Sequence, residues 1–565
     1  MKTYTLQFLL LILLLVAGSA SASKYFKLPV KADEKVILFT DRSIYIAGEQ
    51  VQFSASLLNS GGTDAYKQSR ILYCELITPD GKIISNNKYI LSNSIAGGCV
   101  AIPGDLLTGT YYVRAYTKLM RTYGPESYEY KQIRIINPRR TEVLSSENNS
   151  DFPSQQFLQV KEEQLNDLFS VSADKAFYAS RDSISLSYSQ VNGSIIRIKS
   201  LCLSIVPENS KSLISLKQAT EKSLNSVKEY YPETRGISLA GKLTEATSLT
   251  PVIDKKVNLS IIGEGRDFMA ARTDTGGRFF FALPDYYGVR DIFLCAEKTP
   301  LKEVKIWIDN DFCTTPFRLP SPVFVLTAQE RLVVKNMVQN MQIQTHFQND
   351  SLMDSLNPAI KTKAFYGKPT NTIILDKYIQ LPTLEEYFNE LPSQVKVRKR
   401  KGEPYFSIQS SGTANLSLYD PLVLVDWVAV DEPAKILAAS PQNISRIEVV
   451  NEDYIKGGQT YGGIISFISK KGDFAGIDLP SAGLFINYRF LAENQCLENF
   501  TGYAMNQPDV RNTILWKPAL KVPLSHPEKL LLMAPDTPGK YSVVLEGITT
   551  DGEIFAITTG FEVTD

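Results

Sequence analysis

Histidine is the residue type best suited to metal or acid–base chemistry, and this 565-residue chain has only two, His346 and His526. Neither stands in a His-x-x-x-His or Glu-x-x-His spacing, so metal chemistry is unsupported. The sequence also has no Gly-x-Ser-x-Gly elbow, no phosphate-binding glycine-rich loop and no Cys-x-x-Cys. We therefore predict a protein that is not an enzyme, with no catalytic, cofactor-binding or metal-binding residue and no cofactor.

Cysteine is the second type that could carry chemistry, and the chain holds Cys74, Cys99, Cys202, Cys295, Cys313 and Cys496. Cys74/Cys99 and Cys295/Cys313 are plausible local disulfides if the protein is exported. Spacing proves neither pair, and buried free thiols are the equal alternative. The cysteines are too sparse for a fold built on disulfides.

Two short stretches hold aspartates that could suggest a cation site. Asp274 begins the stretch Asp-Thr-Gly-Gly, for which we predict a glycine-rich hairpin turn. Asp309, Asn310 and Asp311 form one Asp-x-Asp, which supplies too few ligands for calcium. Both stretches are therefore predicted to be structural.

Charge argues against one class of partner. The chain has 60 basic and 60 acidic side chains, so it lacks the positive footprint of a nucleic-acid binder. A local exception is KVRKRKG, from Lys396 to Gly402, with five basic residues in six. Lysines that protect an exposed edge strand explain this run. A contact with lipid phosphates or with an acidic partner is the alternative.

The first 22 residues have the features of a signal peptide. An early lysine precedes an apolar run at 8–17, and Ala-Ser-Ala at 20–22 matches a signal-peptidase site. A transmembrane anchor needs about 20 apolar residues and matches poorly. We expect an exported protein of the periplasm or outer membrane, with no transmembrane segment of its own after cleavage.

Strands dominate the rest of the chain. Apolar and polar residues alternate from Val51 to Leu57, the period of two that a strand with one buried face requires. Short strands recur with turns between them, as at 77–82 and 108–118, which predicts antiparallel β-sandwiches. The predicted fold class is therefore mainly β.

An internal repeat predicts a second sandwich. The stretch SADKAFYASRDSISLSYS (172–189) matches an earlier one at an offset of 133 residues. The corresponding positions are Asp174, Tyr178, Asp182, Ile184 and Leu186 with Asp41, Tyr45, Glu49, Val51 and Phe53.

The earlier stretch, DRSIYIAGEQVQF, and the later TGTYYVRAY resemble the second macroglobulin-type domain of the α2-macroglobulin superfamily. The thioester site of that superfamily has Cys-Gly-Glu-Gln. Here Ala47 replaces the nucleophilic cysteine in Ala-Gly-Glu-Gln, and the motif lies in the wrong domain, so no thioester can form. We predict a turn at this position.

The middle of the chain resembles another module. ARTDTGGRFFFALPD (271–285) resembles the carboxypeptidase-regulatory-like domain, a small β-sandwich. A helix is predicted from Thr327, because Thr327 and Glu330 form a capping box. Met337 and Met341 then recur at helical spacing and are predicted to fill a core, with a partner-binding face as the alternative.

Three later pieces resemble the plug domain of TonB-dependent outer-membrane transporters: PLVLVDWVAV (421–430), ISRIEVVNEDYIKGG and YGGIISFISKKG (461–472). Thr383 and Glu386 predict a capped helix in this region. The resemblance implies an Asp-Gly turn, but Trp427 replaces the glycine, which predicts a different turn geometry. The residues after Gly472 are too few for a transporter barrel, so we expect a plug fold reused for docking or structure.

The predicted fold is a set of tandem β-sandwich (macroglobulin/Ig-like) domains with a small α+β plug-like domain and one connecting helix. The predicted order is signal peptide (1–22), macroglobulin-like sandwich (23–139), linker (140–157), second macroglobulin-like sandwich (158–235), carboxypeptidase-regulatory-like sandwich (236–320), helical connector (321–363), plug-like domain (364–476) and C-terminal sandwich (477–565). This order resembles a group of exported Bacteroidota proteins with macroglobulin and barrel-less plug domains.

The resemblance implies an envelope protein that works through protein contacts. We expect docking onto an outer-membrane protein or assembly, with a TonB-dependent transporter as the candidate partner, in an accessory or scaffold role. The alternative is a macroglobulin-like surface adhesion module that binds proteins or glycans. No interface residue is identified by the sequence.

Overall fold

The computed structural model describes residues 34–59, 68–144, 157–161, 163–164, 169–191, 197–218, 230–262, 267–297, 303–347, 364–391, 394–410, 416–456, 458–479, 483–493, 508–523 and 526–564. The predicted signal peptide, most of the predicted linker and Cys496 lie outside these residues. The described part is mainly β, with several small sheets and few helices, so the predicted fold class is confirmed. Within it, no helix is long and apolar enough to span a membrane.

The N-terminal part of the described chain, from Glu34 to Ile136, forms the first sandwich. One sheet has the order β1-β3-β6 and the other the order β2-β8-β7-β4-β5. The strands are β1 (Glu34–Thr40), β2 (Ile44–Ile46), β3 (Gln50–Asn59), β4 (Ile71–Ile77), β5 (Ile83–Ile90), β6 (Ile95–Ala101), β7 (Gly109–Tyr116) and β8 (Glu129–Ile136). All of β4 and β7 is buried, because these central strands are covered on both faces.

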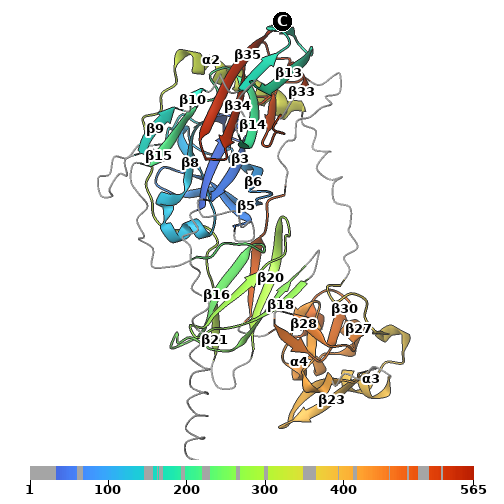
Figure 1. Cartoon of the computed structure of the whole chain (residues 1–565). Helices are drawn as coiled ribbons and strands as arrows, with labels where there is room; N and C mark the ends of the chain where they lie inside the picture. The colour runs from blue at the N-terminus through green and yellow to red at the C-terminus, as the bar shows by residue number, and fades with distance from the viewer. Residues whose placement is uncertain are drawn as a thin grey trace, which may run out of the picture.

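The second sandwich is assembled from two distant parts of the chain. Its first part holds β11 (Phe169–Ala173), β12 (Phe177–Ala179), β13 (Ser183–Gln190) and β14 (Ile198–Pro207), and its second part holds β32 (Leu515–Lys517), β33 (Glu528–Met533), β34 (Gly539–Thr549) and β35 (Ile554–Thr564). Strand β13 pairs with β33, β14 pairs with β32 and β34, and β12 runs parallel to β35. In Figure 1 the teal and red strands therefore lie side by side.

This pairing differs from the sequence prediction of separate sandwiches at 158–235 and 477–565. Each part alone lacks the partner strands that would satisfy its backbone, and together they repeat the first sandwich. The pairs β13–β33, β14–β34 and β12–β35 correspond to β3–β6, β4–β7 and β2–β8. About three hundred residues are thus inserted between β14 and β32 of one sandwich.

The repeat extends to side chains. The hydroxyl of Tyr45 donates to Asp41 Oδ1 at 2.7 Å, and Tyr178 donates to Asp174 Oδ1 at the same distance. The same carboxylates accept the backbone N–H of Gln52 at 3.0 Å and of Ser185 at 2.7 Å. These contacts recur at the offset of 133 residues. In both sandwiches the aspartate and the tyrosine therefore fix the start of the strand that follows them, which is β3 in the first sandwich and β13 in the second.

Arg181 and Asp536 join the two parts of the second sandwich. The Arg181 guanidinium donates to both carboxylate oxygens of Asp536, each at 2.9 Å, and the backbone N–H of Asp509 donates to Oδ2 at 2.8 Å. The hydrogen bonds from Arg181 lower the pKa of Asp536 to about 2.

We expect Asp536→Asn to lower the free energy of unfolding by about 1–2 kcal/mol at neutral pH, because a partly exposed charge-assisted pair is lost. A depressed carboxyl pKa stabilises the fold above the unfolded value of 3.8, and this contribution disappears as the pH falls towards about 2. Denaturant titrations of both proteins from pH 7 to pH 2 should therefore converge at the acid end. A difference that is constant with pH would refute the role of this charge.

The inserted segment first forms a third sandwich. Its sheets have the orders β19-β16-β21 and β18-β17-β20-β31. The strands are β16 (Ser238–Glu245), β17 (Lys256–Ile261), β18 (Asp267–Arg272), β19 (Arg278–Ala282), β20 (Val289–Ala296), β21 (Val304–Ile308) and β31 (Leu484–Arg489). Strand β31 belongs here by its pairing with β20, whereas the sequence predicted it in a C-terminal sandwich. First and third sandwiches share one hydrophobic core.

Helix α2 (Ala328–Phe347) connects the first two sandwiches. The predicted capping box is confirmed, because Thr327 N–H donates to Glu330 Oε2 at 2.8 Å and Glu330 N–H donates to Thr327 Oγ1 at 3.2 Å. Met337 is fully buried against Ile44 and Ile46 of β2, as predicted for a core filler. On the same helix the Asn340 side chain donates to Asn512 Oδ1 in the second sandwich at 3.1 Å.

The insert also holds an α+β domain at 364–479, which precedes β31 and is shown in orange in Figure 1. Its sheet has the order β22-β27-β30-β25-β26, and its core is separate from those of the sandwiches. The elements are β22 (Asn371–Ile374), α3 (Leu384–Glu390), β23 (Val395–Arg400), β24 (Glu403–Ile408), β25 (Leu422–Val425), β26 (Val428–Ala429), α4 (Pro433–Leu437), β27 (Ile444–Val450), β28 (Tyr454–Lys456), β29 (Gln459–Tyr461) and β30 (Ile464–Ser469). Thr383 caps α3 as predicted, by accepting from Glu386 N–H.

The turn between β25 and β26 corrects a prediction. Asp426 and Trp427 have φ values of 45° and 75°, and the strands pair directly across these two residues. Positive φ at both positions is the pattern of the type I′ turn that Asp-Gly forms, so tryptophan did not change the turn class. The Asp426 carboxylate holds the turn by accepting from Ser469 N–H at 2.8 Å, Ser469 Oγ at 2.6 Å and Phe474 N–H at 2.9 Å. Trp427 stacks on Tyr366 with ring centroids 5.7 Å apart.

We expect Asp426→Ala to lower the free energy of unfolding of the α+β domain by about 3 kcal/mol, because buried donors lose their acceptor while the strained turn remains. Thermal unfolding followed by tryptophan fluorescence measures this loss. Asp420→Ala is the matched control, since Asp420 is 72% exposed and its change should have little effect. Equal stability of the Asp426 and Asp420 variants would contradict the anchoring role.

Candidate functional site

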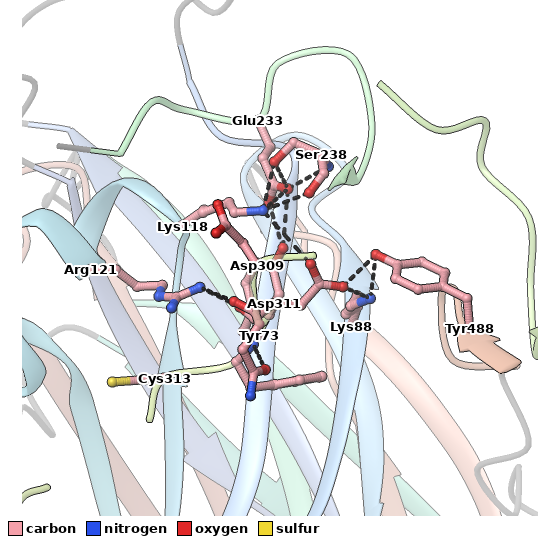
Figure 2. A network of polar contacts seen from close by, with 12 residues as sticks. Tyr73, Lys88, Lys118, Arg121, Glu233, Ser238, Asp309, Asp311, Cys313 and Tyr488 are labelled. Carbon is pink, nitrogen blue, oxygen red and sulfur yellow. Dashed lines mark hydrogen bonds and ion pairs between the residues drawn. The ribbon is translucent and has the colours of Figure 1, made fainter. Parts of the chain in front are cut away.

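A network of titratable side chains lies buried where the first and third sandwiches meet (Figure 2). Lys88 on β5 donates to Asp311 Oδ2 at 2.5 Å, to the hydroxyl of Tyr488 at 2.9 Å and to the carbonyl of Arg489 at 2.7 Å. The Tyr488 hydroxyl also donates to Asp311. One ammonium group thus ties the first sandwich to the segment after β21 and to β31.

Glu233 organises the other half of this network. Its carboxylate accepts from the Tyr73 hydroxyl at 3.0 Å, from Ser238 N–H at 2.6 Å and from Ser238 Oγ at 2.6 Å. Lys118 donates to Ser238 Oγ at 2.8 Å and to its carbonyl at 2.6 Å, and its Nζ lies 3.8 Å from Asp311. Lys118 therefore connects the two carboxylates.

Burial governs the electrostatics of the network. It lowers the pKa of Lys88, an effect that the Asp311 carboxylate opposes, and it raises the pKa of Tyr73 and of Tyr488. These groups donate to and accept from one another, and Lys88 is only 1% exposed. A serine, a lysine and two carboxylates thus lie together, but they are covered by the two sandwiches and serve to join them.

The network shows where Asp309 and Asp311 lie. Asp311 is the buried hub, whereas Asp309 pairs with the half-exposed Arg278. The two carboxylates therefore have separate cationic partners. Arg121 donates to the carbonyls of Asn310 and Asp311, so the whole stretch is held in place by the first sandwich. Local sequence carries no signal for this cluster, because its members are spread over about four hundred positions.

The other predicted candidates are dispersed. His346 is exposed in the last turn of α2, His526 is exposed before β33, and Asp274 accepts from Gly276 N–H and Arg278 N–H in a hairpin turn, as predicted. Ala47 and Gly48 form a turn, as predicted, in which Ile46 N–H donates to Glu49 Oε2. In the part of the chain that the structure covers, no three His, Cys, Asp or Glu side chains are grouped to hold a metal ion.

Within the described residues no disulfide forms between the cysteines, which are Cys74, Cys99, Cys202, Cys295 and Cys313. The structure therefore favours the free-thiol alternative over the Cys74/Cys99 and Cys295/Cys313 pairs. Cys295 on β20 faces the α+β domain, where its thiol lies 3.5 Å from the carbonyl of Ala429. Burial raises the pKa of Cys295 to about 12, so this thiol stays protonated.

The α+β domain rests on one sheet of the third sandwich. Phe268 and Ala270 of β18 pack against apolar residues of β25, β26 and β30, and Ser260 Oγ accepts from Ala429 N–H at 3.2 Å. At the rim, Lys256 and Asn258 contact the Asp431 carboxylate at 3.3 Å and 3.2 Å. This sheet face positions the domain at the end of the molecule away from α2 (Figure 1).

Comparison with known proteins gives structural matches only. No protein-family model matches the chain, and no curated protein matches it. Among solved structures, the α2-macroglobulin of Escherichia coli in its native conformation matches with 10% identity and a TM-score of 0.23, over 94% of this chain and 40% of the other.

Two further solved structures are similar. The α2-macroglobulin of Salmonella reacted with methylamine has 12% identity and a TM-score of 0.22, over 94% of this chain and 39% of the other. Dimeric latent PorU from Porphyromonas gingivalis has 9% identity and a TM-score of 0.14, over 49% and 34%. The chain spans about 40% of the length of the α2-macroglobulins it matches. No activity, substrate or partner follows from matches this distant.

Proposed function

We propose that the chain is a non-catalytic cell-envelope protein that docks through its plug-like α+β domain and its sandwiches onto an outer-membrane assembly. Its role would be that of an accessory or scaffold. A TonB-dependent transporter is the candidate partner, because the 421–472 region resembles a transporter plug.

One observation carries this proposal: the α+β domain has its own core and lies at one end of a frame formed by the joined sandwiches. The frame is held by buried charges at each junction. Lys88 and Asp311 join the first and third sandwiches. Lys211, which pairs with Glu546 inside the second sandwich, donates to the carbonyl of Thr40 in the first sandwich at 2.7 Å. Breaking such buried pairs costs several kcal/mol, so the sandwiches would hold the α+β domain at a fixed distance and orientation.

A domain replacement tests the proposal. Residues 364–479 are exchanged for a Gly/Ser linker, and the share of protein that sediments with outer membranes is compared with that of the intact chain. We expect loss of membrane association for the variant. Hydrogen exchange of the sandwiches is the control, since their protection should persist. Unchanged association with intact sandwiches would overturn the docking role of this domain.

A specific surface favours the alternative, a surface adhesion module. The outer face of the sheet β11-β13-β33 carries a ladder of serines, with Ser170 and Ser189 Oγ atoms 2.9 Å apart and Ser172 and Ser187 Oγ atoms 3.0 Å apart. Leu531 on edge strand β33 is 77% exposed beside it. Flat polar faces with apolar side chains at one edge are suited to binding a protein or a glycan.

Leu531→Asp distinguishes the two functions. Adhesion through the serine face predicts loss of binding to cells or glycans with unchanged membrane association. Docking through the α+β domain predicts that this variant behaves as the intact chain in both assays.

A further inference from the structure

The hairpin of β23 and β24 in the α+β domain carries a concentration of positive charge. Its cations are Lys396, Arg398, Lys399, Arg400 and Lys401, and all five are exposed. Two carboxylates lie near them: Glu403 faces Arg400 across the hairpin, and Asp420 lies 3.5 Å from Arg400. Both members of that ion pair are more than 60% exposed, so it is weak. Five cations against two carboxylates leave a net charge of +3 on a chain whose total is zero.

The strand arranges these charges in a row. Val395 is buried towards the domain core, so the alternate residues Lys396, Arg398 and Arg400 share the outward face. Their positions along the strand are about 6.6 Å apart, since a strand rises about 3.3 Å per residue. Lys401 has a φ of 52° in the two-residue turn, which places a further cation at the tip. The result is a flat cationic row.

Exposed apolar side chains accompany the row. Leu418 is 72% exposed and Tyr419 is 48% exposed, and both immediately precede Asp420, the partner of Arg400. Protection of an edge strand explains charged residues on β23. It does not explain five charges of one sign, nor an aliphatic and an aromatic side chain left in solvent beside them. Cations next to exposed apolar groups are the composition of surfaces that lie in a lipid headgroup layer.

We propose that the β23–β24 hairpin binds the phosphates of an anionic lipid surface, with Leu418 and Tyr419 entering the headgroup layer. The lipid phosphates are bound by Lys396, Arg398 and Arg400 of the row and by Lys401 at the tip of the hairpin. This contact requires no protein partner, so it goes beyond docking onto an outer-membrane assembly and stands independently of it.

Sedimentation with protein-free vesicles tests the proposal on the full chain. The vesicles are phosphatidylcholine with or without phosphatidylglycerol. The charge variant is Lys396→Gln/Arg398→Gln/Arg400→Gln, and the matched control is Lys335→Gln/Lys529→Gln/Lys540→Gln, which removes three exposed lysines elsewhere. Each basic residue near an anionic surface contributes roughly fivefold to binding. We therefore expect about a hundredfold weaker binding to the anionic vesicles for the charge variant and little change for the control.

Binding should also weaken as salt is raised, and inorganic phosphate should displace no more protein than sodium chloride of the same ionic strength, because one phosphate cannot replace several simultaneous contacts. Three outcomes would overturn the proposal: wild-type protein that does not prefer anionic vesicles, equal losses in the charge variant and the control, or greater displacement by free phosphate than by sodium chloride of the same ionic strength. If the intact chain binds polyglutamate but no vesicles, the partner of the cationic row is an acidic protein and not a lipid surface. Because the vesicles hold no protein, a negative result here does not bear on the proposed docking function, which the domain replacement tests separately.

Discussion

Asp311→Ala is expected to destabilise the joined first and third sandwiches by about 3–5 kcal/mol, because it leaves the buried ammonium of Lys88 without its counter-charge. Lys88 is 1% exposed, so water cannot replace the lost carboxylate. The Tyr488 hydroxyl loses its acceptor at the same time. Urea denaturation at neutral pH measures the change in the free energy of unfolding.

Asp309→Ala is the matched control, because Asp309 belongs to the same Asp-x-Asp stretch but pairs with a half-exposed arginine. Its expected cost is below about 1 kcal/mol. The double variant Lys88→Met/Asp311→Leu should recover much of the loss, since an apolar pair removes the unpaired charge. Similar losses for the Asp309 and Asp311 variants would show that the buried network is not what joins these sandwiches.

Removal of residues 508–565 is expected to unfold the first part of the second sandwich as well. Strand β14 would lose both of its partners, and β13 would keep only β11. Leu203 and Ile205 would lose the side chains that bury them. Global unfolding of a domain typically costs 5–15 kcal/mol, so the amide protection of β14 should fall by more than about a thousandfold.

Hydrogen exchange of the truncated and intact chains measures this effect. Replacing 364–479 is the control, because it removes twice as many residues but none of the second sandwich. If β14 keeps its protection without residues 508–565, the two parts are independent domains, as the sequence predicted.

The strands themselves were predictable, because the period of two and the turns are local. The repeat was also visible, since Asp41 and Tyr45 recur as Asp174 and Tyr178 with the same hydrogen bonds. The pairing of β14 with β34 was not, because it depends on backbone hydrogen bonds between segments more than three hundred residues apart. The sequence predicts a separate C-terminal sandwich at 477–565, whereas β32, β33, β34 and β35 complete the second sandwich.

The buried network and the Trp427 turn escaped prediction for a related physical reason. Lys88 and Asp311 look like ordinary surface residues, because the faces that bury them belong to other domains. Type I′ turns favour glycine at their second central position, so tryptophan at 427 argued against this turn type. The three hydrogen bonds of Asp426 and the stacking on Tyr366 outweigh that local preference.

Affinity purification from gently solubilised envelopes tests the central claim most directly. The intact chain and the chain with 364–479 replaced are purified in parallel, and co-eluting proteins are identified by mass spectrometry. The proposed docking function predicts an outer-membrane protein that co-elutes with the intact chain and is absent with the replaced one. The same partners with both chains, or no outer-membrane partner with either, would contradict it.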